Sequence, residues 1–230
     1  APAWLDRVPQ FDTAFGPGYG EEVDWCRRTA ALGARHVAVA DLFVEHRGGS
    51  SFGSDARRRL IARNGAIISA RYPGYDLEVQ DFIAADPLVT ARLALGVAWA
   101  AGAVAAAQQD QGAGAEGPRL YLTHSMGGGV ERYLNRRLAA DLARDGAALV
   151  LRVGGRARWR LELHAPGGVT MAETGDFALL ERLLAPLGRR CAVYACAVGD
   201  PDPLAIPDHL LALCAGPDDR LEVQIHDFFP

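Results

Sequence analysis

The feature that most constrains the fold is a regular alternation of short apolar segments with helical segments over residues 118–230. A short apolar run bounded by turn residues is typical of a strand, whereas apolar spacings of three and four are typical of a helix. Strand–helix alternation implies an α/β fold with a parallel, doubly wound sheet and helices on both faces. The elements predicted here are strands over 120–123, 147–153, 158–164, 191–197 and 221–226, and helices over 130–144, 177–187 and 207–214.

Residues 1–85 predict the end of another α/β unit. A loop rich in glycine, proline and aromatic residues precedes a helix that should end at Gly33, and Ser54 is a suitable N-cap for an arginine-rich helix. The predicted elements are a loop over 9–20, a helix over 21–32, strand segments over 36–40 and 42–45, a helix after Ser54 and a short helix after Gly74.

A helix and a linker are expected between these two parts. Asp86 and Pro87 predict an N-cap and a first helical residue, and the helix should run to about residue 109. Because its apolar residues are mostly alanine, we expect a helix of a water-soluble domain and not a membrane span. Its expected buried stripe is Leu88, Leu95, Trp99 and Val104. Residues 110–117 have a linker composition, so the predicted parts are 1–85, 86–117 and 118–230.

Charge and cysteine content exclude several classes of protein. The net charge is −4, and all 24 basic residues are arginine. A protein that binds nucleic acid usually has a strong basic excess, so no nucleic-acid partner is expected. The four cysteines form no C-x-x-C pair and no zinc-binding spacing with histidine, which is typical of a reducing, cytoplasmic compartment.

The first candidate site is an acidic cluster at a loop–helix junction. Glu21, Glu22 and Asp24 follow the glycine-rich segment that ends at Gly20. A helix N-terminus favours negative charge, so one interpretation is a well-capped helix start. The other is a general base, because a carboxylate on a rigid turn can accept the proton of a substrate hydroxyl. Trp25 is either a core residue or a stacking surface for a ligand ring.

The second candidate site surrounds His46, which a predicted strand delivers into a loop containing Gly48 and Gly49. An isolated histidine is usually structural. Glycines beside it, however, allow a backbone to approach a ligand closely. An imidazole in such a place could bind a metal ion or donate a hydrogen bond to a diphosphate.

The third candidate site is the glycine loop Gly127–Gly129, between a predicted strand and a predicted helix. Exposed amides at a helix N-terminus can bind phosphate or hydroxyl groups. A dinucleotide fingerprint would need Gly or Ala at position 132 and an acidic residue at the end of the next strand. The residues found there are Arg132 and Arg152, so NAD binding fits poorly, and a P-loop, which would need Lys after the glycines, is excluded.

Residues 9–85 resemble the C-terminal end of a family-2, GT-A-type glycosyltransferase. That family has an acidic pair followed by x-Asp-x-Cys-x-Arg, and later a strand ending in a His-Gly-Ser loop. The matching residues are Glu21, Glu22, Asp24, Cys26, Arg28 and His46, with Glu22 in place of the usual Asp. The resemblance implies that Glu22 is the general base, Asp24 orients the helix start and His46 lies near the diphosphate. It also implies substrate contacts from Glu21, Trp25, Gly48 and Gly49.

Residues 118–230 resemble the N-terminal, Rossmann-like half of a family-4, GT-B-type glycosyltransferase. The likeness rests on a histidine, a glycine turn and a Glu-Arg pair near the start of the module. The residues that carry it are His124, Gly127, Gly128, Gly129, Glu131 and Arg132, and His226-Asp227 resembles a later strand end. The resemblance implies that the three glycines, Glu131, His226 and Asp227 contact substrate.

Together the resemblances imply transfer of a sugar from a nucleotide-sugar donor to a glycan acceptor. The first module would use Mg²⁺ or Mn²⁺, with His46 as a candidate ligand, and the second module no metal. No Asp-x-Asp motif precedes the acceptor-side segment, so we expect the chain to lack a donor site and to be inactive alone. Two alternatives stay open: peripheral association with the inner face of the membrane, and a non-catalytic α/β module that binds an anion at Gly127–Gly129.

Overall fold

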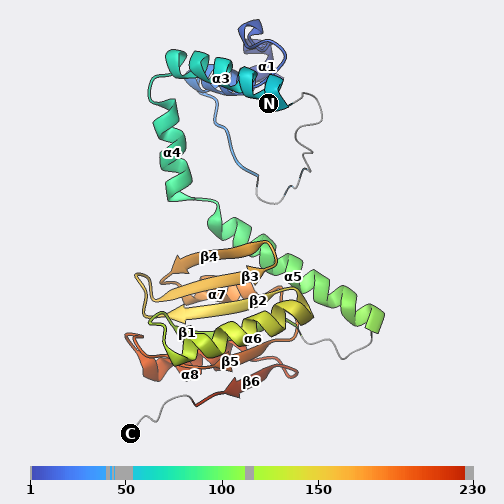
Figure 1. The fold of residues 1–230 in the computed structure, drawn as a ribbon, viewed down its shortest axis with the longest axis vertical. Coiled ribbons are helices and arrows are strands. Elements are labelled where there is room, and N and C mark those ends of the chain that lie inside the picture. Colours follow the sequence, from blue (N-terminus) through green and yellow to red (C-terminus); the bar gives the residue numbers. More distant parts are fainter. Residues whose placement is uncertain (1, 40–41, 43, 45–53, 112–116, 226–230) are drawn as a thin grey trace. The chain divides into compact units, whose positions relative to one another are not determined.

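The computed structural model describes residues 2–39, 42, 44, 54–111 and 117–225 (Figure 1). The chain divides into two compact units, residues 1–86 and 87–230. Each unit is built around its own set of buried side chains.

Unit 1 is helical in the part that the structure describes. Its helix α2 starts directly after Gly20, which takes a left-handed conformation, and ends before Gly33, which also has a positive φ. Both ends agree with the prediction because each is a local property of glycine. The elements are α1 (Pro2–Arg7), η1 (Thr13–Phe15), α2 (Glu21–Ala31), α3 (Ser54–Arg71) and α4 (Tyr75–Ala85).

The strand predicted over residues 36–40 is wrong for its described part. Residues 36–39 have no regular secondary structure, and Val37 and Val39 are exposed. Alternating apolar residues form a strand only when a neighbouring strand supplies hydrogen bonds, and none of the described residues does so here. Leu42 and Val44 are likewise exposed without regular structure, and the rest of the predicted segment 42–45 lies outside the described residues.

Asp86 does not cap the start of the long helix as predicted. It takes a left-handed conformation, with φ 42°, at the end of α4, where its amide donates to the carbonyl of Phe82 at 3.0 Å. The first bond of the next helix runs from the Arg92 amide to the Leu88 carbonyl, so that helix begins at Val89. Asp tolerates the left-handed region better than most residues do, so it can end α4 in this conformation.

Unit 2 is a six-stranded sheet covered by helices. Nearly every predicted element is present, with ends shifted by a few residues. The elements are α5 (Val89–Gln111), β1 (Arg119–His124), α6 (Gly129–Asp145), β2 (Ala148–Val153), β3 (Trp159–Ala165), β4 (Gly168–Thr174), α7 (Phe177–Leu184), β5 (Cys191–Tyr194), η2 (Pro203–Ala205), α8 (Ile206–Leu213) and β6 (Arg220–Val223).

The strand order is β4-β3-β2-β1-β5-β6, and β1, β2, β5 and β6 run parallel. The prediction of a wholly parallel sheet is wrong, because β3 is antiparallel to β2 and β4 is antiparallel to β3. Only residues 154–158 join β2 to β3, which is too short for the crossover that parallel neighbours need. The unpredicted strand β4 follows the two-residue turn Pro166-Gly167, and Pro-Gly is a dipeptide that marks turns.

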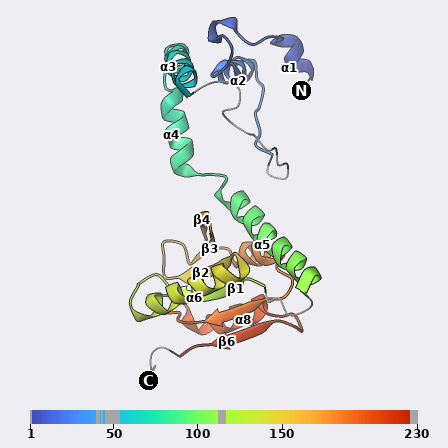
Figure 2. The ribbon, with the colours of Figure 1, turned by 45° about the vertical axis from the view of Figure 1, so that its right-hand side comes forward.

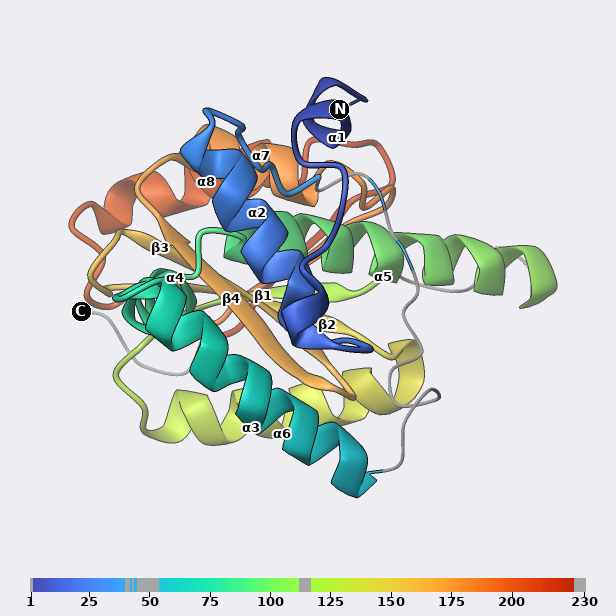
Figure 3. The same ribbon diagram turned by 90° about the horizontal axis from the view of Figure 1, so that it is seen from above.

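Helices cover both faces of the sheet, as predicted. Side chains of α5, α7 and α8, including Leu93, Leu180 and Ile206, join the large core on one face. On the other face Leu134 and Leu138 of α6 pack against the strands. Figure 3 shows α6 on one side of the strands and α7 and α8 on the other. Burial on both faces explains why β2 is apolar almost throughout.

A buried carboxylate fixes α6 to β1. Asp141, which is 1% exposed, accepts hydrogen bonds from the Tyr121 hydroxyl and, at 3.1 Å, from Arg119. Burial and the hydrogen bond to Asp141 together raise the pKa of Tyr121 to about 12. The charge is paired and hydrogen-bonded, as a buried charge must be, so we assign this cluster a structural role.

Helix α5 is long and apolar enough to cross a membrane by length and composition alone, since Val89–Ala106 has a mean hydropathy of 1.5. Its residues Leu93, Val97 and Ala100 nevertheless pack into the sheet core. The sequence predicted this helix as a connector, and in the structure it belongs to unit 2. Its C-terminal part runs past the sheet (Figure 2).

The buried stripe predicted for α5 is wrong at Leu95 and Trp99, whereas Leu88 and Val104 are half-buried. Leu95 and Trp99 are 56% and 61% exposed, and the stripe that faces the sheet lies on a different side of the helix. An alanine-rich helix offers several apolar faces of similar quality. Packing against the sheet therefore selects the buried face.

Substituting two glycines of α5 by alanine should change stability in opposite directions. A Cβ at Gly96 would overlap the buried Leu163 side chain, whereas a Cβ at Gly102 would meet nothing within 4 Å. We expect Gly96→Ala to destabilise unit 2 by about 1–2 kcal/mol through overpacking. Gly102→Ala should stabilise it by about 0.5–1 kcal/mol through helix propensity. Thermal unfolding followed in the near-ultraviolet, where Trp159 reports on the core, checks both, and stabilisation by both variants would contradict the close packing.

Candidate functional site

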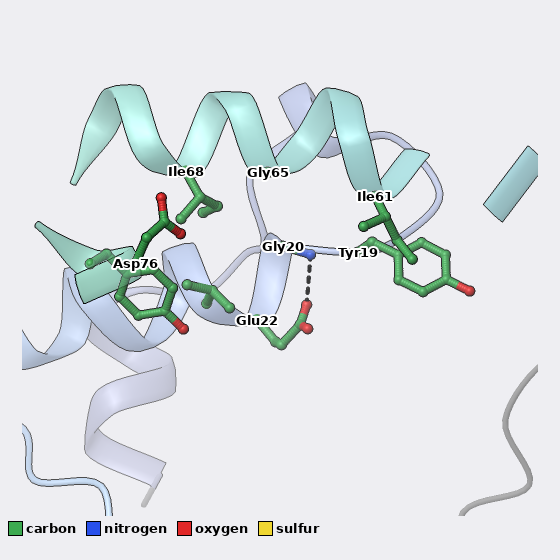
Figure 4. Close-up of a pocket in the computed structure, with 9 residues that line it drawn as sticks. Tyr19, Gly20, Glu22, Ile61, Gly65, Ile68 and Asp76 are labelled. Carbon is green, nitrogen blue, oxygen red and sulfur yellow. Dashed lines mark hydrogen bonds between the residues drawn. The ribbon is translucent and has the colours of Figure 1, made fainter. Parts of the chain in front are cut away.

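A cavity of about 240 Å³ in unit 1 brings the predicted base together with residues from three other segments (Figure 4). Helix α3 forms one wall through Ile61, Gly65 and Ile68, and Figure 4 shows Glu22 across the cavity from it. The residues that line the cavity are Tyr19, Gly20, Glu22, Val23, Ile61, Gly65, Ile68, Tyr75 and Asp76.

The loop before α2 is held in an unusual backbone conformation. Gly16, Gly18 and Gly20 have positive φ, and so does Tyr19, with φ 70°. The loop is anchored by the buried Asn64 of α3, whose amide nitrogen donates to the carbonyls of Phe15 at 2.7 Å and Gly18 at 2.8 Å. These two hydrogen bonds anchor the loop beside the cavity.

Close packing makes Gly20 necessary as well as permitted. A Cβ there would approach the ring of the fully buried Phe15 to 3.2 Å, in addition to the strain of φ 104°. Because Gly20 immediately precedes α2, this packing sets where the helix begins, and with it the position of the acidic cluster.

The position of Glu22 is compatible with both interpretations of the acidic cluster. Its Oε2 atom accepts a hydrogen bond from the Gly20 amide at 3.1 Å, which supports the helix start. The side chain is exposed and lines the cavity. A carboxylate that is anchored on one side and open to solvent can still accept a proton.

Asp24, two residues further, lies in a different environment. It is 1% exposed, and its carboxylate accepts hydrogen bonds from Arg28 at 2.7 Å, Tyr72 at 2.7 Å and Arg71 at 2.9 Å. Burial raises the pKa of Asp24, but the hydrogen bonds from Tyr72, Arg71 and Arg28 outweigh it and hold the pKa below its usual value. Asp24 therefore joins α2 to the end of α3 and does not line the cavity.

Glu21 and Trp25, also predicted for the first site, are not among the residues that line this cavity. The Trp25 indole donates to the Val8 carbonyl at 2.8 Å and meets His36 edge-on, which supports its interpretation as a packing residue. Glu21 has a buried Oε2 atom that accepts no hydrogen bond from the described residues. The predictions for His46, Gly48 and Gly49 lie outside the described residues.

In unit 2, the glycine loop lies where the prediction places it, at the carboxyl end of β1. Helix α6 begins at Gly129, no side chain caps its N-terminus, and a Cβ at Gly127, Gly128 or Gly129 would meet nothing within 4 Å. The His124 ring accepts a hydrogen bond from the Met126 amide at 3.0 Å, which orients the start of the loop. The loop backbone is thus open to a ligand. His226 and Asp227 lie outside the described residues.

Glu131 forms an ion pair with a buried arginine, Arg152, for which the sequence predicted no contact. Arg152 donates to both Glu131 oxygens, at 2.7 and 2.9 Å, and to Glu162 at 2.9 Å. The hydrogen bond from Arg152 is the main cause that lowers the pKa of Glu131. Burial raises the pKa of Glu162, but the His164 hydrogen bond and the Arg152 charge outweigh burial, so the pKa lies below its usual value. Glu131 is therefore a partner of Arg152 in the structure, and its contact with substrate stays a prediction.

A second cavity, of about 420 Å³, lies beyond the carboxyl end of β5 and is almost wholly apolar. Its lining residues are Tyr194, Ala197, Val198, Gly199, Pro203 and Leu204. The loops after β2 and β5 meet beside it, since a Cβ at Gly154 would lie 3.2 Å from the Gly199 carbonyl oxygen. Sequence reasoning missed this cavity because its residues are apolar and carry no chemical motif.

Among the described residues, no group of three or more His, Cys, Asp or Glu side chains could hold a metal ion. The Mg²⁺ or Mn²⁺ implied for the first module stays a prediction, since its candidate ligand His46 lies outside the described residues.

Comparisons of the chain with protein-family models, with characterised proteins and with solved structures find no match. The likeness to glycosyltransferases therefore rests on the motifs alone. Apart from these motifs, a function is supported by the chemistry of two sites, which are the cavity of unit 1 and the Gly127–Gly129 loop of unit 2.

Proposed function

We propose that this chain is part of a glycosyltransferase and that the cavity of unit 1 is its acceptor site. The observation that carries the proposal is the position of Glu22. Its carboxylate is exposed, is anchored on the Gly20 amide and lines a cavity large enough for part of a sugar ring. In the proposed reaction, Glu22 takes the proton of an acceptor hydroxyl as that oxygen bonds to the donor's anomeric carbon and the nucleoside diphosphate leaves.

Rigid placement supports this role for Glu22. A general base must hold its oxygen within hydrogen-bond reach of the hydroxyl, and small displacements reduce the rate strongly. Here the backbone before Glu22 is fixed by Asn64 and Phe15, and the helix after it is fixed by Asp24. Asp24 accordingly acts as a positioning residue, and its buried ion pairs make it unsuited to exchange protons with a substrate.

For unit 2 we propose a role as the N-terminal, Rossmann-like half of a second transferase module. Ligands of open α/β sheets bind outside the carboxyl ends of the strands, at the point where successive connections leave in opposite directions. In this sheet β1 has that position, because β2 lies on one side of it and β5 on the other. The Gly127–Gly129 loop and the apolar cavity after β5 are both at this edge.

A second candidate function is anion binding without catalysis. The open, uncapped N-terminus of the 17-residue helix α6 favours it. Titration of the chain with inorganic phosphate and with nucleoside diphosphates, followed by amide NMR, distinguishes non-catalytic anion binding from the transferase role proposed for unit 2. Non-catalytic anion binding predicts similar shifts of Gly127–Gly129 with both ligands, reduced by Gly128→Ala.

The proposal for unit 1 is tested by Glu22→Gln in the natural polypeptide. Sugar transfer should fall sharply while donor binding stays as in wild type. A transfer rate close to that of wild type would leave Glu22 with only its capping role.

A further inference from the structure

The apolar cavity beyond the carboxyl end of β5 has a wall that polar contacts hold in place. The buried Asp200 carboxylate accepts hydrogen bonds from Arg158 at 2.9 and 3.2 Å and from the Asp202 amide at 2.9 Å. Arg158 also donates to the Asp202 carbonyl at 3.3 Å. These bonds anchor the middle of the segment 198–204, which supplies most of the lining. The cavity is therefore preformed, because an ion pair outside it fixes the position of its wall.

Leu204 lines this cavity and is nevertheless 88% exposed. A single exposed leucine is ordinary on a protein surface. Here, however, the exposed side chain adjoins an apolar cavity, so a ligand that enters the cavity would remove both apolar surfaces from water. Burial of apolar surface is the main favourable contribution to the binding of such a ligand.

The chemistry of the lining indicates the class of ligand. None of the described residues that line the cavity is charged, and Tyr194 is the one polar side chain among them. Burial raises the pKa of Tyr194, and a hydrogen bond from the Ala197 backbone opposes this shift, so the hydroxyl already has a partner within the protein. A nucleobase or a sugar would leave its own donors and acceptors unpaired in this cavity, which is costly. An aliphatic hydrocarbon has no such groups to satisfy.

The size and place of the cavity suit a small-molecule site. Its volume of about 420 Å³ lies within the range of roughly 300–1,000 Å³ that is typical of such sites. Val130, in the first turn of α6, packs with Ala195 and Cys196, and Val198 of the cavity lining packs against the same cluster. The cavity is therefore close to the helix start that follows the glycine loop.

We propose that the cavity after β5 binds an aliphatic hydrocarbon group of the ligand of unit 2. This inference rests on the proposed function of unit 2, which places the ligand at this edge of the sheet. It adds the chemical class of one part of that ligand and assigns a site to it.

Titration of the whole chain with butanol, hexanol and octanol tests the inference, with the amide NMR signals of Val198, Gly199 and Leu204 as the readout. We expect saturable shifts and an affinity that rises about fourfold for each added CH₂ group, the usual gain from burying a methylene. Hexanediol, which has the same chain with a second hydroxyl, should bind about tenfold more weakly than hexanol. Uridine, which carries a polar ring, should leave these signals unchanged.

Three variants locate the binding. Leu204→Asp should weaken hexanol binding by about tenfold, because a charge replaces part of the apolar wall. Leu211→Asp is the matched control, since Leu211 of α8 is 57% exposed and does not line the cavity, and it should bind hexanol as wild type does. Neither substitution removes core packing, because both leucines are exposed. Tyr194→Phe keeps the ring and should bind hexanol at least as tightly as wild type.

Several results would overturn the inference. They are the absence of saturable hexanol binding by wild type, an affinity independent of chain length, equal binding of hexanol and hexanediol, and equal effects of Leu204→Asp and Leu211→Asp. Uridine binding at these amides, or weaker hexanol binding by Tyr194→Phe, would also overturn it by showing a site for a polar ligand. The anion titration of Gly127–Gly129 judges the proposed function of unit 2 separately, so either idea can fail without the other.

Discussion

Replacing Glu22 by Gln should lower the rate of sugar transfer by about 10²–10⁴-fold in the natural polypeptide, the usual effect of removing a general base. Gln keeps the size of the side chain, and its amide oxygen can still accept the hydrogen bond from the Gly20 amide. Only the ability to take a proton is lost. The expected change is therefore in kcat, with little change in the binding of donor or in stability.

The matched control is Asp76→Asn, which removes the other carboxylate of the same cavity. Asp76 accepts a hydrogen bond from the Ser69 hydroxyl at 2.6 Å and lies at the far end of the cavity from Tyr19. We expect its kcat to stay within a few-fold of wild type. Single-turnover transfer with saturating donor, and donor affinity measured by calorimetry, distinguish the two variants. Equal effects of both substitutions on kcat would argue for general electrostatics of the cavity and against a specific base.

Replacing Asp24 by Ala should destabilise unit 1 by about 3 kcal/mol. The substitution removes the shared acceptor of Arg28, Arg71 and Tyr72 at a site that is 1% exposed. Loss of one partner of a buried ion pair costs about 3–5 kcal/mol. The lower end applies here because both arginines keep partial access to water, with 37% and 36% of their side chains exposed.

Hydrogen exchange of the amides in α2 and α3 measures this loss for unit 1 alone, since a chain of two units need not unfold in one step. Asp12→Ala is the control. Asp12 also binds Arg71, at 2.7 Å, but is partly exposed and should contribute much less. Protection in the Asp24→Ala variant equal to that of the control would show that the buried position of Asp24 contributes no special stability.

The Asp24 carboxylate also contributes to the stability of unit 1 in a way that depends on pH, and the direction follows from its lowered pKa. Its folded-state pKa lies below the ordinary value of 3.8, so the unfolded chain binds the proton more tightly than the folded chain does. The stability contributed by ionised Asp24 is therefore fully present above that ordinary value and is lost as the pH falls through the lowered folded pKa. The stability difference between wild type and Asp24→Ala should shrink accordingly in acid.

The sequence predicted those features that depend on short stretches of chain. Helix α2 starts and ends where glycines at positions 20 and 33 permit a left-handed backbone, and Gly146 ends α6 in the same way. The periodicity of α6 and the apolar runs of β1 and β2 follow from their own residues, and the glycine turn between β1 and α6 is local too. An α/β class with helices on both faces could be inferred from these elements alone.

Only one side of the unit 1 cavity, formed by the acidic cluster and the loop before it, could be predicted from the sequence. The acidic cluster and the loop before it are contiguous in sequence, so Glu22 could be chosen as a candidate. Its partners in the cavity come from α3 and α4, and nothing in the residues at Ile61, Gly65 or Asp76 marks them as neighbours of Glu22. Contacts between distant segments depend on packing, which local patterns do not encode.

The sequence by itself determined the helices, most strands and the residue types available for chemistry, because propensity, capping and turn formation act over a few residues. Where two nearby residues have the same local character, only the tertiary structure decided which of them is buried. It buried Asp24 against two arginines while leaving Glu22 open to a cavity, and it turned Leu93 and not Leu95 towards the sheet. It also made β3 antiparallel, since strand direction depends on the length of the connection and on which neighbour is available.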